Sequence, residues 1–158
     1  MRITVLCVGK IKEKFFVQAV EEYRKRLGRY CQLEIIEVKD GQTKENASPA
    51  EQRIVKEQEG ELILKCIRDG YVIALTIDGT SCDSVELSGR LMRLGVEGHS
   101  HICFVIGGSL GLSDAVCKRA DFCLSFSKLT FPHQLMRVIL LEQIYRSFRI
   151  MNHEPYHK

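Results

Sequence analysis

The chain has 158 residues, the size of one compact domain, so a modular multidomain protein is not expected. Hydrophobic residues make up 45% and charged residues 27%, a composition that is typical of globular proteins and excludes a disordered chain. The net charge of +3 is too small to indicate nucleic-acid binding by itself. No apolar run approaches the roughly 18 residues of a membrane span, and the N-terminus lacks a secretion signal, so we expect a cytoplasmic protein away from membranes.

The charges are unevenly distributed along the chain. Residues 1–30 carry eight Lys/Arg and three Glu, whereas residues 31–70 carry six Lys/Arg and nine Asp/Glu. The last 31 residues are basic again. An RNA-facing surface built from the two ends would have this pattern, but ordinary solvated helix faces explain it at least as well.

Seven cysteines form no C-x-x-C pair and are odd in number, which indicates reduced thiols. Cys7, Cys66, Cys103 and Cys123 lie in apolar segments, where a free cysteine behaves as a small buried hydrophobe. No metal site is expected, because the histidines have no cysteine or carboxylate at a supporting spacing.

Short apolar runs alternate with amphipathic helical stretches, a pattern typical of the α/β class with a mostly parallel sheet. The runs are apolar almost without interruption, as in strands that are covered on both faces. The expected strands are residues 2–8, 33–38, 71–77, 101–106 and 122–126.

The first helix is expected where apolar residues recur at helical spacing: Phe15, Phe16, Ala19, Val20, Tyr23 and Leu27. Residues 40–46 are polar and aperiodic, and predict a surface loop. Ser48, Pro49 and Glu51 then form the pattern of a capping box, and residues 83–86 repeat it less cleanly.

A glycine-rich loop over residues 107–111 follows the expected strand 101–106 and precedes a short helix capped by Ser113 or Asp114. Ligands of open α/β sheets bind outside the carboxyl ends of the strands, so Gly107, Gly108 and Gly111 lie where a nucleotide-like ligand is expected. The loop matches neither the dinucleotide fingerprint nor the P-loop. A tight turn without a ligand explains these glycines about equally well.

Two further loops are expected at the same edge. Residues 125–133 follow the last strand, and a turn at Asp78-Gly79 ends the strand that contains Leu75. Together the three loops would form a pocket lined by backbone groups and by Leu75, Leu129 and Phe131. Because this pocket would have few cations, it suits a ligand with a flat base better than a triphosphate. Residues 130–133 are also explained as the start of a helix, without any ligand.

The last helix begins after Pro132 and is apolar around nearly its whole circumference in its first two turns. We expect Leu135, Val138 and Ile139 to face the sheet. Met136, Leu140 and Ile144 would then point away from the sheet and be exposed to water in a monomer. This predicts a homodimer formed through the helix.

No nucleophile constellation is present: the sequence has no G-x-S-x-G elbow, no recognisable Ser or Cys triad and no H-E-x-x-H. Covalent and metal-assisted hydrolysis are therefore disfavoured.

The loops and the last helix carry a specific resemblance. The segments GGSLGL, LSFSKLTFPHQLMRVILLEQIYRSFRI and EPYHK, together with ITVLCVGKIKEKF and EEYRKRLGRY near the start, are similar to the ribosomal RNA large subunit methyltransferase H family. These are the pseudouridine N3-methyltransferases of the SPOUT (α/β-knot) class. The resemblance covers essentially all 158 residues.

The resemblance implies a single SPOUT domain over residues 1–158, with a mostly parallel sheet and a C-terminal trefoil knot. It also implies an obligate homodimer and an S-adenosyl-L-methionine cofactor bent into the knot. The knot is not deducible from periodicity. The implied cofactor contacts are Leu75, Gly107, Gly108, Phe126, Ser127, Lys128, Leu129, Thr130 and Phe131.

The implied reaction moves the sulfonium methyl group to N3 of a pseudouridine in ribosomal RNA, on assembled ribosomes. Direct transfer needs no covalent enzyme intermediate, but it needs a polar group that helps to remove the N3 proton. A terminal segment rich in Tyr and His is the expected source, with Tyr156 on the target base and His157 assisting proton removal. The alternative is that this terminal segment is a disordered, solvated tail with no part in the reaction.

The substrate contacts expected on phosphates or base edges are His133, Arg137, Arg149 and His153. Two other classes of protein remain open. A non-catalytic ribosome-binding factor would use only the basic ends and have no cofactor affinity. A nucleotide-dependent oxidoreductase would use the same loops, but this chain lacks its fingerprint.

Overall fold

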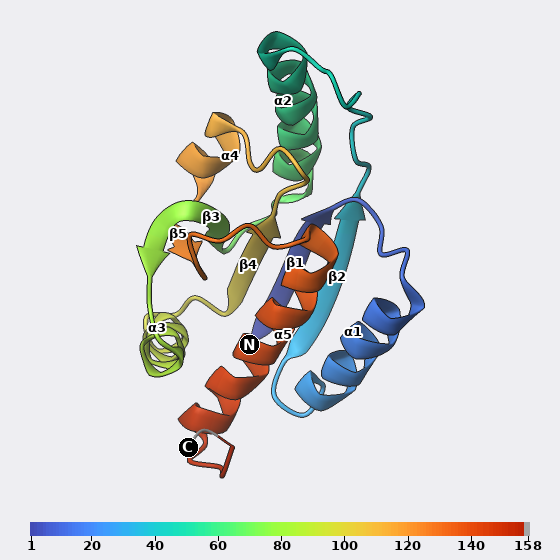
Figure 1. Cartoon of the computed structure of the whole chain (residues 1–158). Coiled ribbons are helices and arrows are strands. Elements are labelled where there is room, and N and C mark those ends of the chain that lie inside the picture. The colour runs from blue at the N-terminus through green and yellow to red at the C-terminus, as the bar shows by residue number, and fades with distance from the viewer. Residues whose placement is uncertain (157–158) are drawn as a thin grey trace.

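The structure of the protein is a computed structural model that describes residues 1–156. Strands and helices alternate along this part of the chain (Figure 1). In chain order they are β1 (Arg2–Val8), α1 (Lys14–Leu27), β2 (Gln32–Val38), α2 (Pro49–Cys66), β3 (Tyr71–Ser81), α3 (Ser84–Val96), β4 (His101–Ile106), α4 (Asp114–Arg119), β5 (Phe122–Ser125) and α5 (His133–Met151).

The strands form one sheet in the order β2-β1-β4-β3-β5, and each neighbouring pair is parallel. The α/β class and the parallel sheet predicted from the alternation of apolar runs are therefore confirmed. All carboxyl ends of the strands lie at one edge of the sheet, which is where ligands of such folds bind.

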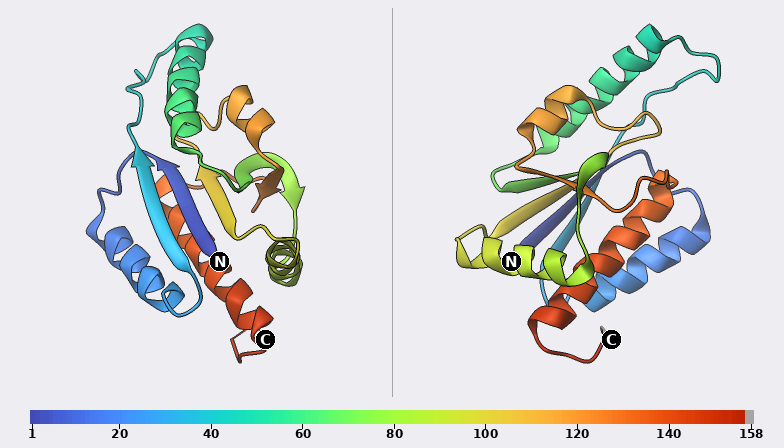
Figure 2. Two further views of the ribbon diagram at one scale, coloured as in Figure 1. Left: turned by 180° about the vertical axis from the view of Figure 1, so that it is seen from behind. Right: turned by 60° about the vertical axis from the view of Figure 1, so that its left-hand side comes forward.

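Helices cover both faces of the sheet. α1, α3 and α5 lie on one face, with α5 between the other two, while α2 and α4 lie on the opposite face (Figure 2). The packing of β1 on both faces explains why its sequence is apolar at nearly every position. Ile3, Val5 and Cys7 pack into the core under α5, whereas Leu6 and Val8 pack into the core under α2.

The predicted helix caps form as the sequence indicated. Ser48 and Glu51 make both hydrogen bonds of a capping box at α2, and Asp83 and Glu86 do the same at α3. Ser113 caps α4, since its side chain accepts a hydrogen bond from the Val116 N–H. In the described part of the chain, no helix combines the length and the apolarity needed to cross a membrane.

The third strand differs from its prediction. β3 does not end in a turn at Asp78-Gly79 but continues to Ser81, after a shift of register against β5 between Leu75 and Thr80. Gly79 permits this course, because a Cβ atom there would lie 2.8 Å from backbone atoms of Cys123 and Leu124.

The faces of α5 were assigned wrongly from the sequence. Leu140 and Ile144 are fully buried in the core that α1, α3 and α5 share with the sheet, whereas Leu135 and Ile139 are only half-buried. The physical reason is that α5 lies between two helices as well as on the sheet, so its buried arc is wide. Phe15 of α1 is also misassigned, since its side chain is 60% exposed.

The segment between β5 and α5 is the least regular connection. It starts beside β3 at the edge of the sheet and crosses to the end of β1, where α5 begins next to Gly9 (Figure 1). This crossing brings residues 126–132 over the carboxyl ends of the strands, where the candidate site lies.

Candidate functional site

A cavity of about 840 Å³ lies at the carboxyl edge of the sheet, within the range of small-molecule sites. Three segments line it: the outer part of β3, the glycine loop after β4, and the loop between β5 and α5. The residues that line the cavity are Leu75–Asp78, Ile106–Leu112, Cys117, Cys123, Leu124, Phe126, Ser127, Leu129–His133 and Met136.

The glycine loop is a tight turn whose backbone faces this cavity. The Gly111 N–H donates a hydrogen bond to the Gly108 carbonyl (3.1 Å), and Gly111 has a φ of +80°. A Cβ atom on Gly107 would lie 2.7 Å from the Gly111 carbonyl carbon. The loop therefore requires glycine for its own fold, and it leaves backbone groups uncovered at the wall of the cavity.

One hydrogen bond joins the end of β5 to β3, and another lies within the loop between β5 and α5. Ser125 Oγ donates to the Ile77 carbonyl (2.8 Å), and the Leu129 N–H donates to Ser127 Oγ (3.0 Å). The Leu129 side chain is 71% exposed at the mouth of the cavity. Lys128 is exposed and is not part of the cavity wall, so it is the one predicted cofactor contact that the structure places outside the lining.

The wall of the cavity carries almost no charge. Among the described residues that line it there is no lysine or arginine, and the single carboxylate is that of Asp78. Such a wall offers no cation to pair with a phosphate group. It suits an uncharged or positively charged ligand with an apolar, planar part.

His133 is the first residue of α5 and lies at the rim of the cavity. Burial and the nearby Arg137 guanidinium lower the pKa of its imidazole below the ordinary value of 6.5, against the opposing effect of Asp40. At neutral pH the ring is therefore uncharged, so it can accept a proton but has little attraction for a phosphate.

Arg137 lies in the interior instead of at an RNA-facing surface. Its side chain is 2% exposed, and Nη1 donates a hydrogen bond to Glu37 Oε1 (2.6 Å). Nη2 donates to the carbonyl oxygens of Val8 (2.8 Å) and Gly9 (2.6 Å). In this arrangement the guanidinium joins α5 to the ends of β1 and β2 and is not free to contact a phosphate.

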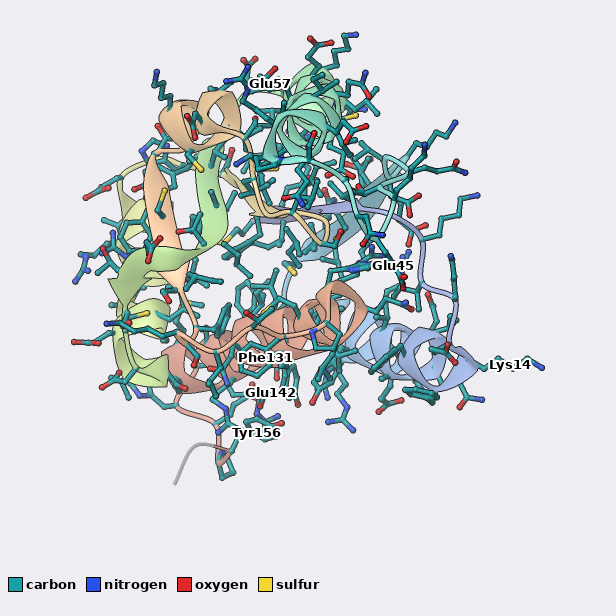
Figure 3. The ribbon with its side chains drawn as sticks, turned by 45° about the horizontal axis from the view of Figure 1, so that its top comes forward. Lys14, Glu45, Glu57, Phe131, Glu142 and Tyr156 are labelled. Carbon is teal, nitrogen blue, oxygen red and sulfur yellow. The ribbon has the colours of Figure 1, made fainter. Side chains whose placement is uncertain are left out.

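Tyr156, the last described residue, packs on α5 away from the cavity. Tyr156 donates a hydrogen bond to Glu142 (3.3 Å), stacks edge-on with Tyr145, and lies beside Glu142 on the side of α5 turned away from the sheet (Figure 3). Glu142 is about nine residues beyond His133, which is roughly 14 Å along the helix axis.

The other predicted substrate contacts lie near the C-terminal end of α5. Arg149 makes an ion pair with Glu154 (2.6 Å) and contacts the Tyr30 hydroxyl. His153 is exposed just after the helix and has a φ of 53°. His157 lies outside the described residues.

Glu59 is a feature of the site region that the sequence analysis missed. This α2 residue is 5% exposed, and Oε1 accepts a hydrogen bond from the Gly41 N–H (2.8 Å), while Oε2 has no partner among the described residues. Burial raises the pKa of its carboxyl group against the opposing hydrogen bond from the Gly41 N–H, and the Asp40 charge raises it further. A Cβ atom on Gly108 would lie 3.0 Å from Oε2, so Glu59 supports the glycine loop from behind.

The described residues contain no group of three or more His, Cys, Asp or Glu side chains able to hold a metal ion. All seven cysteines are free. Cys7 and Cys103 are buried, and burial raises the pKa of Cys103 to about 11, so this thiol is inert at neutral pH.

Comparison with known proteins gives consistent results. A family model described as "Predicted SPOUT methyltransferase" matches residues 1–157. The "Ribosomal RNA large subunit methyltransferase H" of Clostridium kluyveri is 59% identical over the whole length of both chains. The protein of the same name from Clostridium botulinum is 57% identical, again over both whole chains.

The fold has a counterpart among solved structures. A probable methylase family protein from Haemophilus influenzae superposes with a TM-score of 0.50 at 11% sequence identity, which bears on the fold alone. The superposition covers 96% of this chain and 66% of that chain, so the present chain spans about two thirds of the longer protein.

Proposed function

The chain belongs to the SPOUT methyltransferase family, and from that premise we propose that it methylates large-subunit ribosomal RNA with S-adenosyl-L-methionine as the methyl donor. The proposed target is N3 of a pseudouridine, and the proposed substrate is the assembled ribosome in the cytoplasm. The relatives named for large-subunit RNA methylation, matched over their whole length, support the substrate class.

The observation that carries the proposal is the chemistry of the cavity wall. S-adenosyl-L-methionine has a planar base, a sulfonium cation and no phosphate. The wall matches these features, because it is mostly apolar, has one carboxylate at Asp78 and has no lysine or arginine among the described lining residues. A nicotinamide dinucleotide, which an oxidoreductase would bind, carries phosphates for which this wall provides no cation.

The residues around the cavity fit such a cofactor. Leu75, Leu124 and Phe131 provide apolar surface for a base, and the tight turn at Gly107 leaves backbone groups within reach of polar atoms. When bound, the cofactor supplies an electrophilic methyl group. The protein then has to hold the target base in line with that group and to take up the proton that leaves N3.

We further propose that the chain forms a C-terminal trefoil knot and that the protein is a homodimer. The crossing of residues 126–132 from β5 to the end of β1 supports the knot, since a knot requires the chain to pass over other connections at this place. The half-buried Leu135 and Ile139 on α5 support the dimer, because they offer apolar surface to a second copy.

The packing of Tyr156 has a consequence for its proposed role. Within one chain Tyr156 contacts Glu142, well along α5 from the cavity. If the C-terminal segment acts on the target base, the segment has to come from the second copy of the dimer.

Transfer of labelled methyl from S-adenosyl-L-methionine tests the function. Intact ribosomes, isolated large subunits and free ribosomal RNA, each from cells lacking the activity, are offered in parallel. We expect label on ribosomal RNA, and nucleoside mass spectrometry should locate it on N3 of a pseudouridine. Cofactor binding without label on any particle would indicate another target, whereas no binding at all would indicate the non-catalytic ribosome-binding factor.

A further inference from the structure

Proton removal from N3 needs an acceptor in the cavity, and few side chains there can serve. The titratable residues of the described lining are Asp78, Cys117, Cys123 and His133. Thiols keep their proton at neutral pH unless a cation stabilises the thiolate, and burial raises the pKa of Cys117. As a class, carboxylates are weaker bases than imidazoles. The imidazole of His133 is the remaining acceptor.

The end of β1 holds His133 in place. A Cβ atom on Gly9 would lie 3.5 Å from His133 Nε2, so the ring packs directly against this glycine. Gly9 has a φ of +78°, and its carbonyl accepts a hydrogen bond from Arg137 (2.6 Å). The Lys12 N–H donates to Gln134 Oε1 (2.9 Å), which joins the segment after β1 to the first turn of α5. The imidazole therefore sits at the rim of the cavity on a braced backbone.

The charges around the ring keep it in its proton-accepting form. Arg137 on α5 and Lys12 after β1 lower the pKa of His133, in addition to burial, while Asp40 after β2 raises it. Glu37 on β2 is engaged by the Arg137 guanidinium. The net result is a pKa below 6.5, so the neutral imidazole predominates at physiological pH.

From this geometry we propose that His133 is the proton acceptor of the methyl transfer. This rests on the proposed function. It gives His133 the proton-accepting role that was expected of His157, which lies outside the described residues, in place of the phosphate contact expected of His133 from the sequence. The N3–H bond breaks and its proton passes to an imidazole nitrogen. The electron pair left on N3 forms the bond to the methyl carbon, while the carbon–sulfur bond breaks and leaves its pair on sulfur. The products are N3-methylated pseudouridine, S-adenosylhomocysteine and an imidazolium that releases its proton to water.

An NMR titration of the free protein gives a readout that does not depend on turnover. Two-bond ¹H–¹⁵N spectra recorded from pH 5 to 8.5 report each imidazole, and the His133→Asn variant identifies the signal of His133. We expect this ring to titrate below 6.5. A pKa above the pH of the transfer assay would overturn the proposal, because the ring would then be mostly protonated and could not accept the N3 proton.

Single-turnover methyl transfer supplies the second test. The wild-type rate should rise with pH through the pKa of His133 and then level off. His133→Asn and His133→Gln should lower the plateau by about 10²–10⁴-fold and remove that rise, with the cofactor Kd changed less than about threefold. His99→Asn is the matched control, because His99 is exposed and outside the cavity lining, and it should keep the wild-type profile.

The outcomes separate this inference from the proposed function. An active wild-type enzyme with equally active, correctly folded His133 variants contradicts this inference alone. A wild-type protein inactive on every ribosomal substrate contradicts the proposed function, and this inference with it.

Discussion

Gly107 shows how a single backbone position shapes the cavity. Gly107→Ala would place a Cβ atom 2.8 Å from the Gly111 carbonyl oxygen, and both atoms belong to a tight turn that cannot yield locally. Such overpacking costs about 1–3 kcal/mol. The loop has to shift to relieve this overlap, and the shift distorts the cavity wall. We therefore expect the Kd for S-adenosyl-L-methionine, measured by calorimetry, to rise roughly tenfold or more.

Gly89→Ala is the control for this change. Gly89 is in α3, and a Cβ atom there meets nothing within 4 Å. Alanine favours a helix interior over glycine by about 0.5–1 kcal/mol, so this variant should be slightly more stable and bind the cofactor normally. Equal affinities of the Gly107 and Gly89 variants would contradict a role for the glycine loop in cofactor binding.

Arg137 has a structural role at the same scale. Arg137→Met would leave two carbonyl oxygens and the Glu37 carboxylate without their buried donor, and breaking such a pair costs roughly 3 kcal/mol. Urea unfolding should show this loss. Arg53→Met removes an ion pair whose side chains are 73% and 62% exposed, and should cost no more than about 0.5 kcal/mol. An unfolding free energy unchanged by Arg137→Met would contradict this role.

At the scale of elements, α5 connects the cavity to a cluster of aromatic side chains near the C-terminus. It begins at the rim of the cavity with His133 and ends near the cluster of Tyr30, Tyr145 and Tyr156. Arg146 lies over the Tyr156 ring with its guanidinium carbon 4.6 Å from the ring centroid. The C-terminal segment is therefore an ordered part of the helix surface up to Tyr156.

Truncation after Asn152 tests the role of this segment. It removes the aromatic contact of Tyr156 with Tyr145, worth about 0.5–1.5 kcal/mol, and leaves every cavity residue in place. We expect normal S-adenosyl-L-methionine binding and loss of methyl transfer. Tyr156→Phe keeps the ring and removes the hydroxyl with its hydrogen bond to Glu142, so it separates the contribution of the packing from that of the hydroxyl. Unchanged turnover of the truncated protein would exclude a catalytic role for the segment.

At the scale of the whole molecule, assembly is the main prediction. Sedimentation equilibrium at micromolar concentration should give twice the mass of the 18.1 kDa chain. Ile139→Glu places a charge on the half-buried side of α5 and should shift the equilibrium toward monomer, since burial of an unpaired charge opposes association. Val96→Glu, at a position 85% exposed on α3, should remain dimeric. A wild-type mass of one chain would contradict the dimer.

Much of the fold was predictable because its signals are local. The five strands were located by their continuous apolar runs, and the caps at Ser48, Asp83 and Ser113 by hydrogen bonds that span only three residues. The errors occur where distant segments decide the outcome. β3 passes Gly79 only because β5 lies alongside it, and the buried arc of α5 depends on α1 and α3.

Sequence alone determined the parallel α/β fold, the glycine loop and the loop before the last helix at one edge of the sheet, and the family resemblance, since periodicity, capping and motif residues are properties of the chain itself. Tertiary structure alone decided what individual polar residues do. It buried Arg137 between the ends of β1 and β2, placed Glu59 behind the glycine loop, set His133 at the rim of the cavity and packed Tyr156 against Glu142. The reason is that the charge state and reach of a side chain depend on burial and on neighbours brought from other elements, which no local pattern of the sequence specifies.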